Sequence, residues 1–310
     1  MTTYSVDSSH DVADQDPMPP DRPPLGPPML RALRPRQWVK NLLVVAAPLA
    51  AGSLDDADVA GRTALAFAAF CLVASAVYLV NDVIDADEDR RHPSKRRRPV
   101  AAGEIAPRTA IATAAVLLCA GLALGYGVAL ELGLTMTVYV AIQAAYSLGL
   151  KNQPVMDLAA VAAGFLLRAI AGGVASGIYL SPWFLLVAAF GSLFMVAGKR
   201  YSEIHAIGPH AGTRRSLEYY SESYLRFVWG LAASVAVIAY SLWAFDQASE
   251  GGFAWEEISV APFVLGMLRY AVDIDRGAAG APEDIVFGDR VLQVLGVAWI
   301  AAVCLGIWQR

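Results

Sequence analysis

Four oxygen-bearing side chains close a long apolar stretch, namely Asn81, Asp82, Asp85 and Asp89. On a helix, Asn81, Asp85 and Asp89 each lag the one before by about 40°, so one face carries all three, with Asp82 close by. Such a column repels itself unless a cation lies among its oxygens. Mg²⁺ suits these ligands and usually completes its shell with waters and substrate phosphates. The spacing therefore predicts a magnesium site made by all four residues, with the three aspartates as the catalytic group.

A basic segment, residues 90–98, follows the acidic residues at once. Most of its arginines are explained by the positive-inside rule and by attraction to anionic lipid headgroups. Lys95 and Arg98 differ, because Pro93 and Pro99 restrict the loop around them and can aim their side chains back at the metal site. We expect these two residues to bind phosphate.

A second cationic group precedes the first apolar run. Arg34 and Arg36 fit membrane topology alone, whereas Lys40 and Asn41 lie a turn further in and are harder to explain that way. The full set expected to bind substrate consists of Lys40, Asn41, Lys95, Arg98, Tyr146, Lys151, Arg168, Lys199, Arg200, Tyr201 and Glu203.

Two members of this set have competing explanations. Arg168 lies deep in an apolar run and needs an internal partner. A structural ion pair, with Asp157 or another carboxylate, explains it as well as a ligand contact does. Lys199 and Glu203 are spaced i, i+4, which fits a simple helix salt bridge. The density of hydrogen-bond donors there also favours a second anion site.

The composition places the chain among polytopic membrane proteins. Of its 310 residues 56% are hydrophobic and 17% charged, whereas soluble proteins carry about 25% charged residues. The net charge is -4, and no nucleic-acid partner is expected. Nine apolar runs are long enough to cross a bilayer: Trp38–Leu54, Thr63–Val80, Ala110–Leu130, Gly133–Leu150, Val155–Ala175, Pro182–Ala197, Phe227–Phe245, Ile258–Ala271 and Val291–Ile307.

The basic residues fall in alternate loops, and this pattern predicts the orientation in the plasma (inner) membrane. The N-terminus and every candidate site residue are expected on the cytoplasmic side, with the C-terminus outside. Residues 1–30 are polar and Pro-rich, which predicts a disordered cytosolic tail. Residues 31–310 are expected to form a single transmembrane catalytic domain, and the sequence leaves room for a homo-oligomer.

The acidic motif with the following His92-Pro93-x-Lys95 and Arg98-Pro99 resembles the first aspartate-rich signature of the UbiA superfamily of intramembrane prenyltransferases. The resemblance implies an all-α fold of about nine transmembrane helices around a central cavity open to the cytoplasm. More narrowly, residues 190–201, 268–275 and 282–285 resemble the actinobacterial decaprenyl-phosphate phosphoribosyltransferases. Ordinary superfamily members carry a second Asp-rich motif after the sixth helix, where this chain has Lys199, Arg200, Tyr201 and Glu203.

The narrower resemblance implies a magnesium-dependent pentosyltransferase. It would move the 5-phosphoribosyl group of phosphoribosyl diphosphate to a polyprenyl (decaprenyl) phosphate in the bilayer, releasing diphosphate, for cell-wall arabinan synthesis. The nearest alternative is a conventional prenyltransferase with a prenyl diphosphate donor, and the missing second acidic motif counts against it. An ion or phosphate transporter is a third reading, although transporters usually place polar groups at mid-membrane.

Overall fold

The computed structural model describes residues 26–92, 95–207, 219–247, 253–277, 279, 285 and 288–309. Over these residues the chain forms helices and turns and contains no strand. Residues 1–25, most of the predicted tail, lie outside the described part, as do Pro93 and residues 282–284. Helix α1 (Pro28–Leu33) includes the last three residues assigned to that tail.

All nine apolar runs coincide with helical segments. The first is a 3₁₀ helix, η1 (Pro35–Val45), continued by the short α2 (Ala46–Ala50). The other long helices are α3 (Ala57–Ile84), α5 (Pro107–Val128), α6 (Leu130–Leu148), α7 (Met156–Ser176), α8 (Pro182–Ile207), α9 (Glu222–Gln247), α10 (Trp255–Asp275) and α12 (Arg290–Trp308). Short helices lie in the loops: α4 (Ala86–Arg91), η2 (Lys95–Arg97) and η3 (Leu150–Asn152).

Six of the helices within the described residues are long and apolar enough to cross a bilayer, namely α3, α5, α7, α8, α9 and α12. The protein is therefore an integral membrane protein. The other three predicted spans, at η1–α2, α6 and α10, do not meet this test, so the number nine remains a prediction. Apolar side chains point outward from the bundle, as at Val116, Val294 and Val297, each more than 65% exposed. Such a surface is stable only against lipid.

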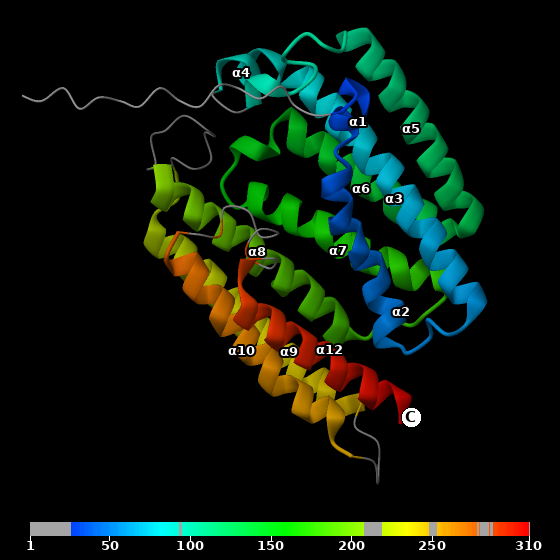
Figure 1. The fold of residues 1–310 in the computed structure, drawn as a ribbon, viewed down its shortest axis with the longest axis vertical. Coiled ribbons are helices and arrows are strands. Elements are labelled where there is room, and N and C mark those ends of the chain that lie inside the picture. Colours follow the sequence, from blue (N-terminus) through cyan, green and yellow to red (C-terminus); the bar gives the residue numbers. More distant parts are fainter. Residues whose placement is uncertain are drawn as a thin grey trace, which may run out of the picture.

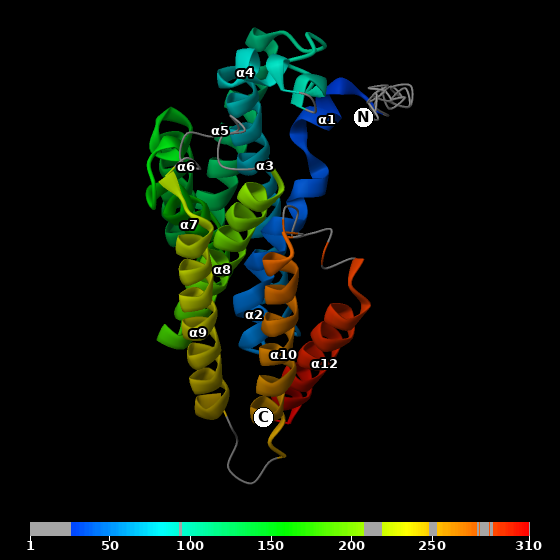
Figure 2. The same ribbon diagram turned by 90° about the vertical axis from the view of Figure 1, so that its left-hand side faces the viewer.

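The helices pack mainly with their neighbours in the chain: α3 with α5, α6 with α7, α7 with α8, α8 with α9, and α10 with α12. Figure 1 shows α3 and α5 at one side of the bundle and α9, α10 and α12 at the other, with α7 and α8 between them. Figure 2 shows α1 and α4 together at one end and the C-terminus toward the other. The acidic residues therefore lie at the α1–α4 end.

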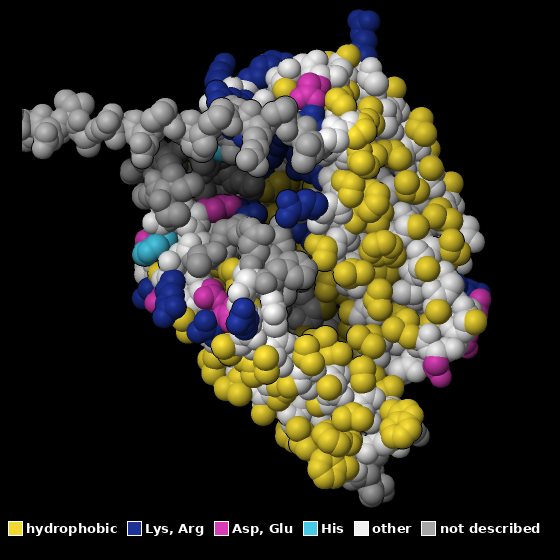
Figure 3. Space-filling view, in the orientation of Figure 1, with side chains coloured by type: hydrophobic (Ala, Val, Ile, Leu, Met, Phe, Trp, Pro, Cys, Tyr) yellow, Lys and Arg dark blue, Asp and Glu magenta, His cyan; other side chains and the backbone are white. Residues whose placement is uncertain are grey.

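Charge is distributed accordingly over the surface. In Figure 3, Lys and Arg side chains gather over the α1–α4 end and around a hollow near the middle of this face, whereas hydrophobic side chains cover much of the rest. A membrane protein keeps its charged groups at the interface or around an internal site. The charged end is thus the place to look for chemistry.

Candidate functional site

The acidic residues straddle a break between two helices. Helix α3 ends at Ile84 and α4 begins at Ala86, with Asp85 between them at φ -90° and ψ 5°. Hydrogen bonds of helical spacing nevertheless continue across the break, because the amide of Asp85 donates to the carbonyl of Asn81 (2.9 Å) and that of Asp89 to Asp85 (2.8 Å). The side chains keep roughly the helical spacing that the sequence predicted.

Two of the carboxylates, Asp82 and Asp89, share one guanidinium. Arg98 donates through Nη1 to Oδ2 of Asp89 at 2.6 Å and lies 3.4 Å from Oδ1 of Asp82. Both aspartates are buried, at 1% and 2% exposed. Buried carboxylates that stay ionised need such pairing. The Arg98 side chain thus points back to the acidic residues, whereas its binding of phosphate stays a prediction.

Arg34 is a site residue that the sequence analysis assigned only to topology. Its guanidinium forms an ion pair with Oδ1 of Asp82 and lies over the ring of Tyr78, 4.9 Å from the ring centre. Its backbone is left-handed (φ 54°, ψ 58°) and joins α1 to η1 directly before Pro35. Such a conformation is strained for arginine and must be held by its surroundings. The neighbouring proline was the available signal that the chain turns sharply here.

The other two acidic-motif residues contact α6 and the loop after it. Lys151 donates through Nζ to Oδ1 of Asp85 at 2.7 Å, and Ser147 donates to Oδ1 of Asn81 at 2.5 Å. The structure thus joins Lys151 to the site as expected and adds Ser147, which sequence reasoning missed. The only sign in the sequence that Ser147 belongs to the site was its position beside Tyr146 at an otherwise apolar helix end.

Within the described residues, no three His, Cys, Asp or Glu side chains are arranged to hold a metal ion by themselves. Mg²⁺ needs only one or two protein carboxylates when phosphates and waters complete its shell. Asp82 and Asp89 lie close to a common guanidinium, and Oδ2 of Asp82 is buried without a hydrogen-bond partner. The oxygen donors therefore fit magnesium that arrives with a phosphorylated substrate.

Arg168 and Asn41 bind each other, and no carboxylate of the described residues pairs with Arg168. The Nε of Arg168 donates to Oδ1 of Asn41 at 2.7 Å, and its other nitrogens donate to the Gly164 carbonyl (2.6 Å) and the Tyr139 hydroxyl (3.0 Å). The suggested ion pair with Asp157 does not form. These contacts tie η1 to α6 and α7 and favour an anchoring role over a substrate contact.

The same junction depends on a glycine. A Cβ at Gly172 of α7 would overlap the carbonyl of Val44 in η1. Backbone atoms cannot move aside as a flexible side chain can, so Gly172→Ala should cost about 1–3 kcal/mol or more. We expect a clearly lower thermal unfolding temperature in detergent. Gly191→Ala in α8 is the matched control, because nothing lies within 4 Å of its Cβ position; equal effects of the two changes would contradict the close packing of η1 on α7.

Arg200 and Glu203 belong to a buried network at the end of α8. Arg200 donates from Nε to Oδ2 of Asp157 (3.2 Å) and from Nη1 to Oε2 of Glu203 (2.9 Å). Tyr146 lies in α6 beside Ser147, and its role in substrate binding stays a prediction. Glu203 thus pairs with Arg200, and the ion pair with Asp157 joins Arg200 to the start of α7. Arg200 is only 3% exposed.

Tyr201 points into the packing between helices. It belongs to the hydrophobic core formed by α8, α9 and α10, and its hydroxyl accepts a hydrogen bond from Arg226 at 2.8 Å. Arg226 also donates to Asp275 at 2.9 Å, and both of these side chains are 57% exposed. None of these contacts reaches the acidic motif, so they favour a packing role for Tyr201.

The remaining candidate cations are half-buried and engaged with neighbours. They are Lys40 in η1, Lys95 in η2 and Lys199 in α8. Their contacts leave their predicted roles in substrate binding untested.

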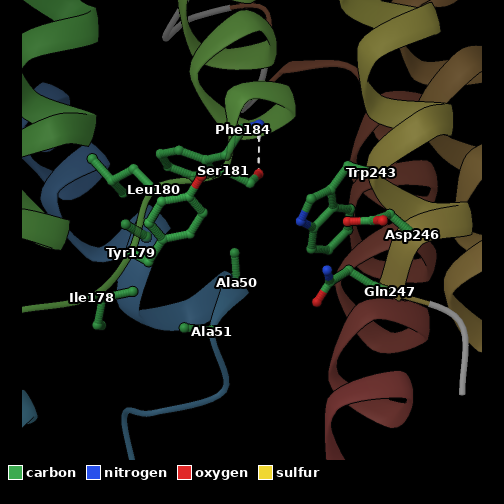
Figure 4. A pocket seen from close by; sticks show the side chains of 11 residues that line it. Ala50, Ala51, Ile178, Tyr179, Leu180, Ser181, Phe184, Trp243, Asp246 and Gln247 are labelled. Carbon is green, nitrogen blue, oxygen red and sulfur yellow. Dashed lines mark hydrogen bonds between the residues drawn. The ribbon is translucent and has the colours of Figure 1, made fainter.

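A cavity of about 360 Å³ lies at the other end of the bundle, away from the acidic motif. Figure 4 shows Ala50 at the end of α2 with Ala51 after it, Tyr179 and its neighbours before α8, and Trp243 with Asp246 of α9 around the cavity. No Lys or Arg lines this cavity among the residues that the structure describes. A phosphate group would find no counter-charge there, so this cavity is not a site for the chemistry that the acidic motif suggests.

Comparisons with known proteins identify the family of the chain. Residues 42–207 match the UbiA prenyltransferase family. The chain is 50% identical over 306 residues to a decaprenyl-phosphate phosphoribosyltransferase of Mycolicibacterium smegmatis, covering 93% of this chain and 96% of the relative. It is 53% identical over 280 residues to one of Mycobacterium tuberculosis, covering 89% and 92%.

The fold is also similar to that of a solved structure, a UbiA homolog from Archaeoglobus fulgidus bound to DMAPP and Mg²⁺. The TM-score is 0.70 at 20% identity, over 91% of this chain and 99% of the other. At that identity the likeness concerns the arrangement of helices alone.

Proposed function

This chain belongs to the UbiA prenyltransferase family, and from that membership we propose that it is a decaprenyl-phosphate phosphoribosyltransferase. It transfers the 5-phosphoribosyl group from phosphoribosyl diphosphate to a polyprenyl phosphate and releases diphosphate, a step toward cell-wall arabinan. Identity of about 50% to enzymes of that name over nearly the whole chain supports this function over the conventional prenyltransferase and the transporter.

The main structural support for this function is that basic and acidic side chains meet at the site. Three cations from separate segments, Arg34, Arg98 and Lys151, contact the three aspartates. Donor and acceptor together bring a diphosphate, a 5-phosphate and a lipid phosphate. A prenyltransferase that binds one diphosphate through metal ions between two Asp-rich motifs needs fewer basic residues. Several basic residues beside a single Asp-rich motif suit a pair of substrates that carries more phosphate groups.

We assign magnesium to Asp82 and Asp89, with Asp85 and Asn81 in support. When bound, the ion supplies Lewis-acid stabilisation of a diphosphate leaving group. Solved relatives of the same fold contain divalent ions, namely Mg²⁺ or Cd²⁺, which supports use of such an ion.

The basic residues bind the leaving group directly. As phosphate oxygens enter, Arg98 and Lys151 exchange their carboxylate partners for the diphosphate and stabilise its developing charge. Arg is suited to this exchange because its planar donors match phosphate oxygens as well as carboxylates. The attacking lipid phosphate is already an anion near neutral pH, so the reaction needs no general base. Lys40, Lys95 and Lys199 complete the anion-binding set.

We also propose how the protein is oriented in the plasma membrane. Residues 31–310 form a single catalytic domain in the plasma membrane, with residues 1–30 as a cytosolic tail. The N-terminus and the site face the cytoplasm, where a soluble phosphorylated donor is available, and the C-terminus lies outside. Basic residues around the α1–α4 end support this orientation.

The direct test uses purified protein in detergent with labelled phosphoribosyl diphosphate, a polyprenyl phosphate and Mg²⁺. We expect a labelled lipid that requires all three additions. If the protein is inert with this pair but transfers a prenyl group from a prenyl diphosphate, the narrower function is wrong and only the family stands. Solute flux in proteoliposomes without any product would favour the transporter.

A further inference from the structure

The loop between α6 and α7 contains a strained turn. Val155 has φ 67° and ψ -44°, and it is one of two non-glycine residues with positive φ in the described part of the chain. The amide of Met156 donates to the carbonyl of Pro154 at 2.8 Å. This closes a classic γ-turn, which is rare and strained, and a β-branched residue makes it costlier. Such a turn persists only where its surroundings hold it.

The hydroxyl of Tyr220 holds it. This hydroxyl accepts a hydrogen bond from the amide of Val155 at 2.6 Å and donates one to Oδ1 of Asp157. Asp157 is fully buried and also accepts a hydrogen bond from Arg200, so a second helix, α8, helps to fix its position. Burial raises the pKa of Tyr220 above its ordinary value, and the hydrogen bond to Asp157 raises it further. The phenol therefore keeps its proton and can fill both roles.

The turn adjoins the segment that carries Lys151 into the site. Lys151 lies in η3, and the amide of Gln153 donates to the carbonyl of Leu150 at 3.0 Å. Only three residues separate Lys151 from Val155. A change of the backbone at Val155 therefore moves the lysine, whose Nζ lies 2.7 Å from Asp85.

We propose that Tyr220 is a positioning residue: its hydroxyl holds the strained turn at Val155 and thereby keeps the Lys151 amino group beside Asp85 for the phosphorylated donor. Tyr220 lies outside the acidic motif and outside every basic segment, just before α9. The inference rests on the proposed function in one respect, that Lys151 binds the donor.

The test is Tyr220→Phe, which removes only the hydroxyl. The amide of Val155 loses its acceptor and the turn can relax. We expect the KM for phosphoribosyl diphosphate to rise about tenfold, with a smaller change in kcat. Hydrogen exchange of the amides of residues 150–156 should quicken by at least about tenfold. In the same background, Val155→Gly should bring the KM back toward wild type, because glycine adopts positive φ without strain.

Tyr224→Phe is the matched control. Its ring stacks on that of Tyr220, but it is 37% exposed, and it should change neither KM nor exchange. A lower unfolding temperature for Tyr220→Phe with unchanged KM and exchange would show a structural role only and overturn the proposal. Failure of Val155→Gly to lower the raised KM of Tyr220→Phe would also overturn the proposal. Should wild type make no labelled lipid, the proposed function fails, and hydrogen exchange alone then decides whether Tyr220 holds the turn.

Discussion

Asp82→Asn should lower kcat for labelled lipid by about 10³-fold or more. The carboxylate of Asp82 is 1% exposed, contacts Arg34 and Arg98 through Oδ1 and leaves Oδ2 without a partner. An amide keeps the shape but loses the charge that would hold a metal ion, and loss of one group that stabilises a leaving anion costs about 10²–10³-fold on its own. The measurement is the initial rate at saturating substrates, repeated over a Mg²⁺ titration.

Asp87→Asn is the matched control for this change. Asp87 lies in the same run, but its side chain is 85% exposed, and its partner among the described residues is Arg90 at the surface. Exposed pairs contribute little, so the variant should behave as wild type. A rate for Asp82→Asn within tenfold of wild type, with an unchanged Mg²⁺ requirement, would remove Asp82 from the metal site.

Arg98→Met should have the second-largest effect, a loss of about 10²-fold in kcat. Arg98 is the one side chain seen to contact both Asp82 and Asp89 among the described residues. Its loss removes a cation from the leaving diphosphate. Arg98→Lys should recover only part of the rate, because an ammonium group lacks the planar fork that matches two phosphate oxygens. Steady-state kinetics with both substrates measure these effects.

A measurement of Mg²⁺ binding without substrate distinguishes whether Arg98 binds the diphosphate or only neutralises the carboxylates. The guanidinium competes with a metal ion for the same carboxylates, so Arg98→Met should bind Mg²⁺ at least as tightly as wild type while turning over slowly. Arg96→Met is the control, since Arg96 is exposed in η2, two residues before Arg98. Wild-type activity in Arg98→Met would mean that Arg98 only neutralises the carboxylates when no metal is present.

Much of the site could be predicted because its spacing is local. Residues seven apart on a helix lie nearly above one another, which is why Asp82 and Asp89 come to share one guanidinium despite the break at Asp85. Arg98 follows within a short loop, so its contact with the acidic residues could also be predicted from the sequence. The membrane helices were evident from length and hydropathy, although three of the nine ranges fail the test for a membrane span.

Partners distant in the chain were not predictable in this way. Arg34 and Asp82 are 48 residues apart, and Arg168 and Asn41 are 127 apart. A positive charge before a membrane helix satisfies the topology rule wherever it finally points. The rule therefore explained Arg34 without locating it, and an arginine in an apolar helix called for a partner without naming it.

Composition by itself determined that this is a membrane protein, and the acidic motif predicted a hard-cation site next to bound phosphate, because helix periodicity and hydropathy act over a few turns. Tertiary packing alone decided which cation meets which carboxylate, that Tyr201 lies in the core, and that Tyr220 supports the turn beside Lys151. The reason is physical: such contacts depend on how closely whole helices approach, and at η1 and α7 that distance is set by the absence of a single Cβ at Gly172.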